Sequence, residues 1–140
     1  MRYWDASALV PLIAAESDSE RVRSWLSEDD HVVTWAWTRT EVTSAIERRT
    51  REGLLSRRQR RDVLDRLGIL ASGWDEVTDV LAVRSRAEAL VARHPLRAAD
   101  AGQLGAALLV QEHLAGALTF VCRDQRLLSA ADVEGLRILA

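Results

Sequence analysis

The stretch Leu118-Thr119-Phe120-Val121-Cys122-Arg123-Asp124 decides the fold of this chain. Its first five residues form a short apolar run, which predicts a buried strand that ends just before an acid. The same pattern opens the chain, where residues 2–4 are a short strand candidate and Asp5 follows directly. Two strands of this kind, at opposite ends of the sequence, indicate a parallel sheet with polar residues at one edge.

Between these ends, apolar and β-branched runs alternate with segments of helical periodicity. Further strands are predicted at residues 31–34, 76–80 and 136–139, of which 76–80 has the weakest pattern. Apolar spacing of three and four residues predicts helices that begin near Ser7, Ser19, Thr38, Ser56, Leu81, Ala98 and Leu127. This alternation predicts an α/β fold, a single domain over residues 1–140 with a parallel β-sheet of four to five strands flanked by helices on both faces.

The composition fits one compact protein domain. The chain has 140 residues, 48% of them hydrophobic, and a single cysteine, Cys122, which excludes an intrachain disulfide. The N-terminus lacks the basic and apolar regions of a secretory signal. No apolar run approaches the roughly 20 residues needed to cross a bilayer. We therefore expect a cytoplasmic protein with no membrane association.

The charge of the chain is unevenly distributed. All nineteen basic residues are arginine, and the formal net charge is -2. The segment Arg48–Arg66 holds eight arginines against three acids, a local net charge of +5. Two interpretations stay open: a basic flank that binds a polyanion beside an acidic site, or a pair of helices that arginine merely solvates.

Four carboxylates stand at comparable places relative to the predicted elements. Asp5 and Asp124 follow strands, while Glu41 and Asp100 stand near the starts of amphipathic helices. Parallel α/β sheets bind ligands beyond the carboxyl ends of their strands. Four uncompensated carboxylates in one crevice would repel one another unless a divalent cation neutralised them. Oxygen ligands without a His or Cys cluster favour Mg²⁺ or Mn²⁺ over zinc.

The four acids, with the segments Asp5-Ala6-Ser7, Leu96-Arg97-Ala98-Ala99-Asp100 and Phe120-Val121-Cys122-Arg123-Asp124, make the whole chain similar to the PIN-domain nucleases. It most resembles the VapC toxins of toxin–antitoxin pairs. The resemblance implies a metal-dependent endoribonuclease that cuts structured RNA, such as tRNA or a ribosomal loop. It also implies a cognate VapB-like antitoxin and a homodimer. The acids implied as catalytic residues and as ligands of Mg²⁺ or Mn²⁺ are Asp5, Glu41, Asp100 and Asp124.

Bound metals would supply what phosphodiester hydrolysis needs: an activated water, charge relief on the phosphate and stabilisation of the leaving oxygen. No side-chain nucleophile is then required. Ser7 resembles the small hydroxyl that the family keeps beside the metal, where it would orient Asp5 or a bound water. Helix capping is the structural alternative for Ser7. Cys122 stands where the family usually has Thr or Ser, and we expect it to act as a small buried hydrophobe.

Several basic and aromatic residues are candidates for contact with RNA or an antitoxin. Arg123, next to Asp124, would reach a substrate phosphate or form a structural ion pair. Trp35 and Trp37 precede the helix of Glu41 and would stack on bases or a partner side chain, with core packing expected for at least one of them. The full set of candidate contacts is Arg48, Arg57, Arg58, Arg61, Arg123 and Trp37.

The same residues argue against two other functions. A phosphoacceptor receiver domain shares the size and layout but relies on a lysine, and this chain has none. A haloacid-dehalogenase-like phosphatase needs a second Asp two residues after the first, where this chain has Ser7. A PIN domain that only binds RNA or a partner protein stays open as the alternative to an enzyme.

Overall fold

A five-stranded sheet forms the centre of the protein. The computed structural model describes residues 1–140, and every neighbouring pair of strands in it is parallel. The order across the sheet is β3 (Asp75–Val77), β2 (Val32–Trp35), β1 (Arg2–Trp4), β4 (Thr119–Val121) and β5 (Arg137–Leu139). The predicted parallel α/β sheet is therefore confirmed, and even its weakest predicted strand, β3, is present.

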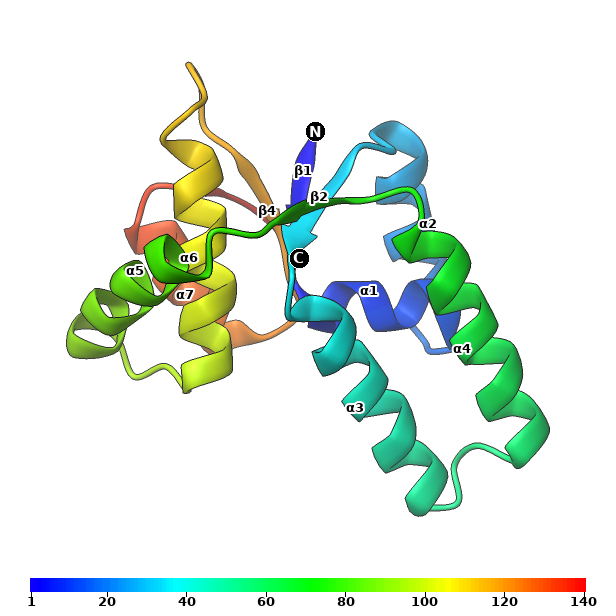
Figure 1. Cartoon of the computed structure of the whole chain (residues 1–140). Helices are drawn as coiled ribbons and strands as arrows, with labels where there is room; N and C mark the ends of the chain where they lie inside the picture. Colours follow the sequence, from blue (N-terminus) through cyan, green and yellow to red (C-terminus); the bar gives the residue numbers. More distant parts are fainter.

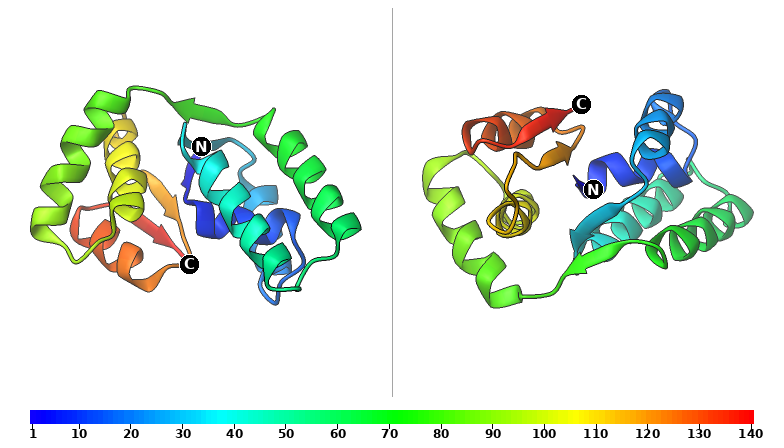
Figure 2. Two further views of the ribbon diagram at one scale, coloured as in Figure 1. Left: turned by 60° about the horizontal axis from the view of Figure 1, so that its bottom comes forward. Right: turned by 90° about the horizontal axis from the view of Figure 1, so that it is seen from above.

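Seven helices cover the two faces of this sheet (Figure 1). On one side lie α1 (Ala6–Ile13), α2 (Ser19–Glu28), α3 (Thr38–Arg51) and α4 (Arg57–Ala71). On the other side lie α5 (Val80–Arg93), α6 (Ala98–Gln111) and α7 (Gln125–Val133). Figure 2 shows the same division from two further directions. None of the seven helices is long and apolar enough to span a lipid bilayer.

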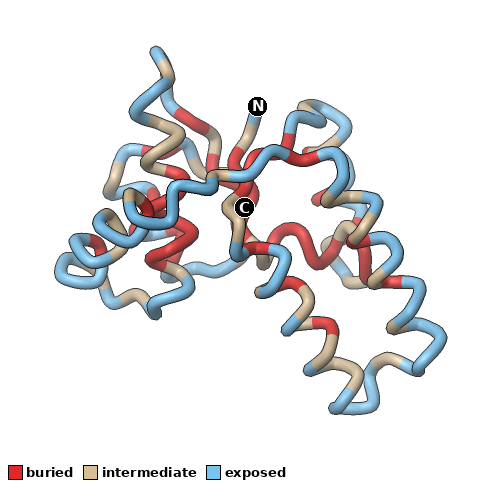
Figure 3. Tube along the Cα trace, viewed as in Figure 1, coloured by how far each residue is buried: buried red, intermediate tan, exposed pale blue.

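Each face of the sheet has its own apolar core, because side chains alternate along a strand. In β1, Tyr3 packs into the core beneath α5, α6 and α7, while Trp4 packs into the core beneath the first four helices. Both side chains are fully buried. Figure 3 shows the buried chain concentrated at the sheet and the neighbouring helix faces, and exposed chain at the outer end of the α3–α4 hairpin.

The order of the strands creates a switch point beside β1. The chain passes from β1 to β2 and β3 on one side, then returns to place β4 on the other side of β1. Connections on either side of such a point leave in opposite directions, which opens a crevice at the carboxyl ends of the two central strands. Asp5 follows β1 and Asp124 comes soon after β4, so both acids lie at this crevice.

Local sequence signals explain where several helices begin and end. Ser56 and Gln59 form a reciprocal capping box at the predicted start of α4, and Gly53, with φ of 75°, follows the end of α3. The prediction that Ser7 caps α1 was wrong: Asp5 is the cap, because its carboxylate accepts the Ser7 backbone N–H. At α3, Trp37 occupies the cap position without a side-chain hydrogen bond, so Glu41 is not part of a capping box.

Candidate active site

Asp5 is the most enclosed of the four acids. Its Oδ2 accepts hydrogen bonds from the Ser7 backbone N–H at 3.0 Å, from Ser7 Oγ, and from Cys122 Sγ at 3.4 Å. Burial raises the pKa of Asp5, and the hydrogen bonds from Ser7 oppose that shift. Oδ1 of Asp5 accepts no hydrogen bond. The only fully buried side-chain nitrogen or oxygen without a hydrogen-bond partner is Trp4 Nε1. Asp5 Oδ1 also lacks a partner, so it is not fully buried and stays accessible from the crevice.

Ser7 and Cys122 hold Asp5 from two different elements. Ser7 Oγ also accepts the Arg123 backbone N–H at 2.9 Å, which ties the start of α1 to the segment after β4. Cys122 is fully buried, and burial raises the pKa of its thiol, with the charge of Asp5 acting in the same direction. The thiol therefore stays protonated and donates to Asp5. It serves as a weak donor rather than as a nucleophile.

Glu41 projects from the first turn of α3. Its Oε1 accepts hydrogen bonds from Trp35 Nε1 at 3.3 Å and from Gln103 Nε2 at 3.1 Å. Burial raises the pKa of Glu41 to about 7; the Trp35 hydrogen bond opposes this shift, and the charges of Asp5 and Asp100 add to it. Two neutral donors thus fix the orientation of this carboxylate without neutralising its charge.

Asp100 and Asp124 complete the crevice from the helices α6 and α7. Asp100 lies in the first turn of α6, where burial raises its pKa and the charge of Asp124 contributes. Asp124 caps α7, since its Oδ1 accepts the N–H groups of Arg126 at 2.9 Å and Leu127 at 3.0 Å. The two acids line one hollow of about 360 Å³ that contains no hydrophobic residue.

A buried polar network behind Glu41 escaped the sequence analysis. Gln103, fully buried on α6, donates to Thr38 Oγ1 at 3.0 Å as well as to Glu41. Tyr3 donates its hydroxyl to Gln103 Oε1 at 2.9 Å, which leaves the amide nitrogen facing Glu41. The available signal was one buried amide in an otherwise small and apolar helix, three residues after Asp100 and therefore on the same helix face.

The two tryptophans before α3 have different environments. Trp35 is partly buried, and its ring lies so close to Gly102 that a Cβ there would stand 3.1 Å from it. Trp37 is 58% exposed at the start of α3, one turn before Glu41. Trp35 therefore belongs to the packing between β2 and α6, while Trp37 is free to contact a ligand.

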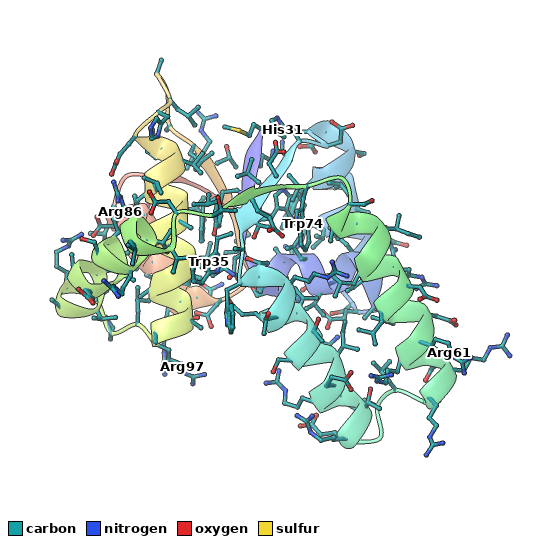
Figure 4. The ribbon with its side chains drawn as sticks, viewed as in Figure 1. His31, Trp35, Arg61, Trp74, Arg86 and Arg97 are labelled. Atoms are coloured by element: carbon teal, nitrogen blue, oxygen red, sulfur yellow. The ribbon has the colours of Figure 1, made fainter.

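The candidate contact arginines divide into two groups. The side chain of Arg123 does not contact the four candidate acids. It forms ion pairs with Glu16 at 2.6 Å and with Asp18 at 2.5 Å, so the structural ion pair is the alternative that applies to this residue. The others are exposed and form no ion pair, and they lie on the α3–α4 hairpin, away from the four acids: Arg48, Arg57, Arg58 and Arg61. Figure 4 shows Arg61 directed outward from α4.

The donor set fits a hard cation such as Mg²⁺ or Mn²⁺ that is bound partly through water. Carboxylate oxygens free of any ion pair line the crevice, and their charges raise one another's pKa. No three His, Cys, Asp or Glu side chains stand close enough together to hold one ion directly. Mg²⁺ commonly keeps several waters and uses only one or two carboxylates, which this arrangement provides.

Comparison with known proteins agrees with the geometry. The family model of the PIN domain matches residues 2–133, which is nearly the whole chain. No curated protein matches the sequence significantly.

Solved structures share the fold at low sequence identity. FitAcB from Neisseria gonorrhoeae superposes with a TM-score of 0.67 at 20% identity, over 100% of this chain and 97% of that one. A toxin–antitoxin complex from Klebsiella pneumoniae gives a TM-score of 0.64 at 16% identity, over 100% and 97%. PAE2754 from Pyrobaculum aerophilum gives 0.62 at 21% identity, over 99% and 89%.

Proposed function

Because this chain belongs to the PIN domain family, we propose that it is a Mg²⁺- or Mn²⁺-dependent endoribonuclease and the toxin of a VapBC-type toxin–antitoxin pair. One observation carries the proposal. The acids Asp5, Glu41, Asp100 and Asp124 gather at the carboxyl edge of the sheet, and none of them takes part in any ion pair of the chain. Carboxylates that form no ion pair in an arginine-rich protein are available to a metal ion.

The residues of the chain divide the work of such a site. Asp5 and Glu41 would hold the metal with the oxygens that the protein leaves free, while Asp100 and Asp124 would act from the opposite rim. When bound, the metal supplies a water of lowered pKa and relieves charge on the phosphate. Ser7 fixes the rotamer of Asp5, and Gln103 fixes that of Glu41, so both carboxylates are positioned in advance.

An antitoxin partner is supported by the structural relatives. One of them is a toxin–antitoxin complex, and another is FitAB bound to a DNA fragment. In this chain the α3–α4 hairpin carries exposed arginines and is the surface we assign to a VapB-like antitoxin or to RNA. We also propose that the protein is cytoplasmic and forms a homodimer. Light scattering of the purified protein should then give a mass twice that of one chain.

Cleavage of total bacterial RNA by the antitoxin-free protein tests the enzymatic proposal. We expect discrete new 5′ ends in the presence of Mg²⁺ or Mn²⁺, which disappear with EDTA and in the Asp100→Asn variant. The position of the cuts identifies the RNA. A folded protein that binds Mn²⁺ and produces no cuts in any RNA would instead support a PIN domain that only binds RNA or a partner.

A further inference from the structure

The hollow beside Asp100 and Asp124 is bordered by positive charge. Besides the two acids, its lining consists of Arg97, Gln125 and Arg126, and it contains no hydrophobic residue. Arg97 immediately precedes α6, and Arg126 lies in the first turn of α7, so two different helices supply the two cations. Figure 4 shows Arg97 extending away from the end of its helix.

The two arginines are near the acids without being paired to them. Burial raises the pKa of Asp100, and the charges of Arg97 and Arg126 oppose that shift. No guanidinium nitrogen of either arginine lies within ion-pair distance of a carboxylate oxygen, although the Arg126 backbone N–H donates to Asp124. Arg123 makes the contrast clear, because that neighbouring side chain is fully engaged by Glu16 and Asp18. Arg97 and Arg126 therefore keep their guanidinium donors for another acceptor.

The electrostatics of the crevice indicates which acceptor these free donors would bind. An acidic crevice repels the phosphates of an RNA, so a nuclease of this kind must hold its substrate by cations placed near the acids. A guanidinium presents two parallel donors that match the oxygens of a phosphate, and this pairing is stronger than a neutral hydrogen bond. A polar hollow with an arginine on each of two walls has the chemistry for one phosphate group.

We propose that Arg97 and Arg126 form a phosphate-binding subsite for the RNA substrate. The subsite takes a backbone phosphate next to the one that is cut, since the hollow is lined by Asp100 and Asp124 but not by Asp5 or Glu41. It thereby sets the register of the strand in the crevice. This inference rests on the proposed ribonuclease function and assigns to it two residues outside the acidic motif.

Binding measurements on an inactive protein test the subsite. The probe is a fluorescently labelled pool of bacterial tRNA, titrated in EDTA with the Asp5→Asn protein, which keeps the RNA intact. Asn is as good a helix cap as Asp at position 5. In this background, Arg97→Ala and Arg126→Ala should each raise the Kd about tenfold. The slope of log K against log salt should fall by roughly 0.7 to 1 for each arginine.

Arg137→Ala is the matched control. Arg137 is also exposed and unpaired, but it lies in register with Thr119 at the amino end of the strands, on the edge of the sheet opposite the crevice. Its loss removes the same charge and should leave the Kd within about twofold, since no specific contact is lost. Arg97→Lys and Arg126→Lys should recover the salt slope but only part of the affinity, because lysine lacks the paired donors.

The outcomes separate the subsite from the function. If the Asp5→Asn protein binds tRNA and all three alanine variants bind it equally well, the subsite is wrong and the ribonuclease proposal stands. If the unsubstituted chain neither binds nor cuts RNA, the function fails and the subsite fails with it. Unchanged melting temperatures of the variants confirm that lost binding is not lost folding.

Discussion

Glu41 and Glu134 are both partly buried carboxylates that accept hydrogen bonds from two residues, but their partners differ in charge. Glu41, in the crevice, is held by the neutral donors Trp35 and Gln103, and burial raises its pKa to about 7. Burial also acts on Glu134, yet the hydrogen bonds and charges of His94 and Arg93 outweigh it and lower the pKa of that carboxyl.

The difference shows how this protein separates stability from chemistry. At the corner between α5 and α7, Arg93 forms an ion pair with Glu134 and His94 hydrogen-bonds to it, which holds two helix ends together. In the crevice, neutral groups orient Asp5 and Glu41, and no ion pair compensates the negative charge of either carboxylate. Such an arrangement costs stability in the absence of a ligand, and it is typical of a functional site.

Among substitutions in the crevice, we expect the greatest loss of activity at Asp100. Asp100→Asn should lower the rate of RNA cleavage by roughly 10³-fold, because it removes a charged oxygen from the metal site. Its melting temperature should stay unchanged or rise, since burial disfavours the charge that is lost. Single-turnover cleavage and thermal melting measure the two quantities.

Glu134→Gln is the matched control for that experiment. It should keep the cleavage rate within about twofold and lose about 1 kcal/mol of unfolding free energy with the ion pairs. Equal losses of activity in both variants would contradict the separation drawn above.

The second prediction concerns the neutral donor of the crevice. Gln103→Leu should reduce the cleavage rate about 10- to 100-fold, because Glu41 loses one of its two donors. It should also cost about 1–3 kcal/mol in stability, since the Tyr3 hydroxyl loses its buried acceptor. Mn²⁺ affinity, measured by calorimetry on the same variant, should fall as well.

Tyr3→Phe distinguishes positioning from packing in that network. It removes the hydroxyl that orients Gln103 but leaves the Gln103 contact with Glu41 in place. We expect a similar loss of stability with a smaller loss of Mn²⁺ affinity. If the two variants lost Mn²⁺ affinity equally, Gln103 would have no special role toward Glu41.

The third prediction is an opposite pH dependence at the two glutamates. The folded state raises the pKa of Glu41 from its usual 4.5 to about 7, so it keeps a proton that the unfolded chain releases between these values. The metal-free protein should therefore lose about 1–2 kcal/mol as pH rises from 4.5 to 7, a figure that allows for partial solvent access. The stability that Glu134 contributes is present above pH 4.5 and is lost as pH falls through its lowered pKa.

Urea denaturation in EDTA at several pH values measures both slopes. Glu41→Gln should reduce the loss above pH 4.5, and Glu134→Gln should reduce the loss at lower pH, because other carboxylates with shifted pKa values contribute the rest. Addition of Mn²⁺ at pH 8 should stabilise the wild type more than Glu41→Gln, because a ligand that binds only the folded state raises its stability. If Glu41→Gln left the pH profile of stability unchanged, the pKa of Glu41 would not be raised in the folded protein.

Arg123 connects the crevice to a cluster of ion pairs, and we expect its substitution to have only a small effect. The backbone N–H of Arg123 donates a hydrogen bond to Ser7 in the crevice, and its side chain forms ion pairs with Glu16 and Asp18. Arg123→Ala should therefore cost about 1 kcal/mol in stability without changing tRNA affinity. Equilibrium unfolding and the tRNA titration check this. Weaker tRNA binding would return Arg123 to the set of RNA contacts.

Much of the fold was predictable because its signals are local. The strand predicted at residues 118–122 and the helix start predicted near Ser56 each depend on residues within a few positions of one another. Ser7 was the exception, since Asp5 could fill the same capping role from two residues away. The orientation of Arg123 was beyond local signals, because its partners Glu16 and Asp18 are more than 100 residues distant in sequence.

The alternation of strands and helices is a local property of the sequence, and it specifies the parallel sheet, the strand ends and the edge at which Asp5 and Asp124 lie. Which charges are free depends instead on how distant segments pack together. Gln103 meets Glu41 across 62 residues, and Arg97 shares a hollow with Arg126 because α6 and α7 begin side by side. Pairing of charged groups depends on distance in space, and the electrostatic energy of a carboxylate depends on burial, neither of which is written in local sequence.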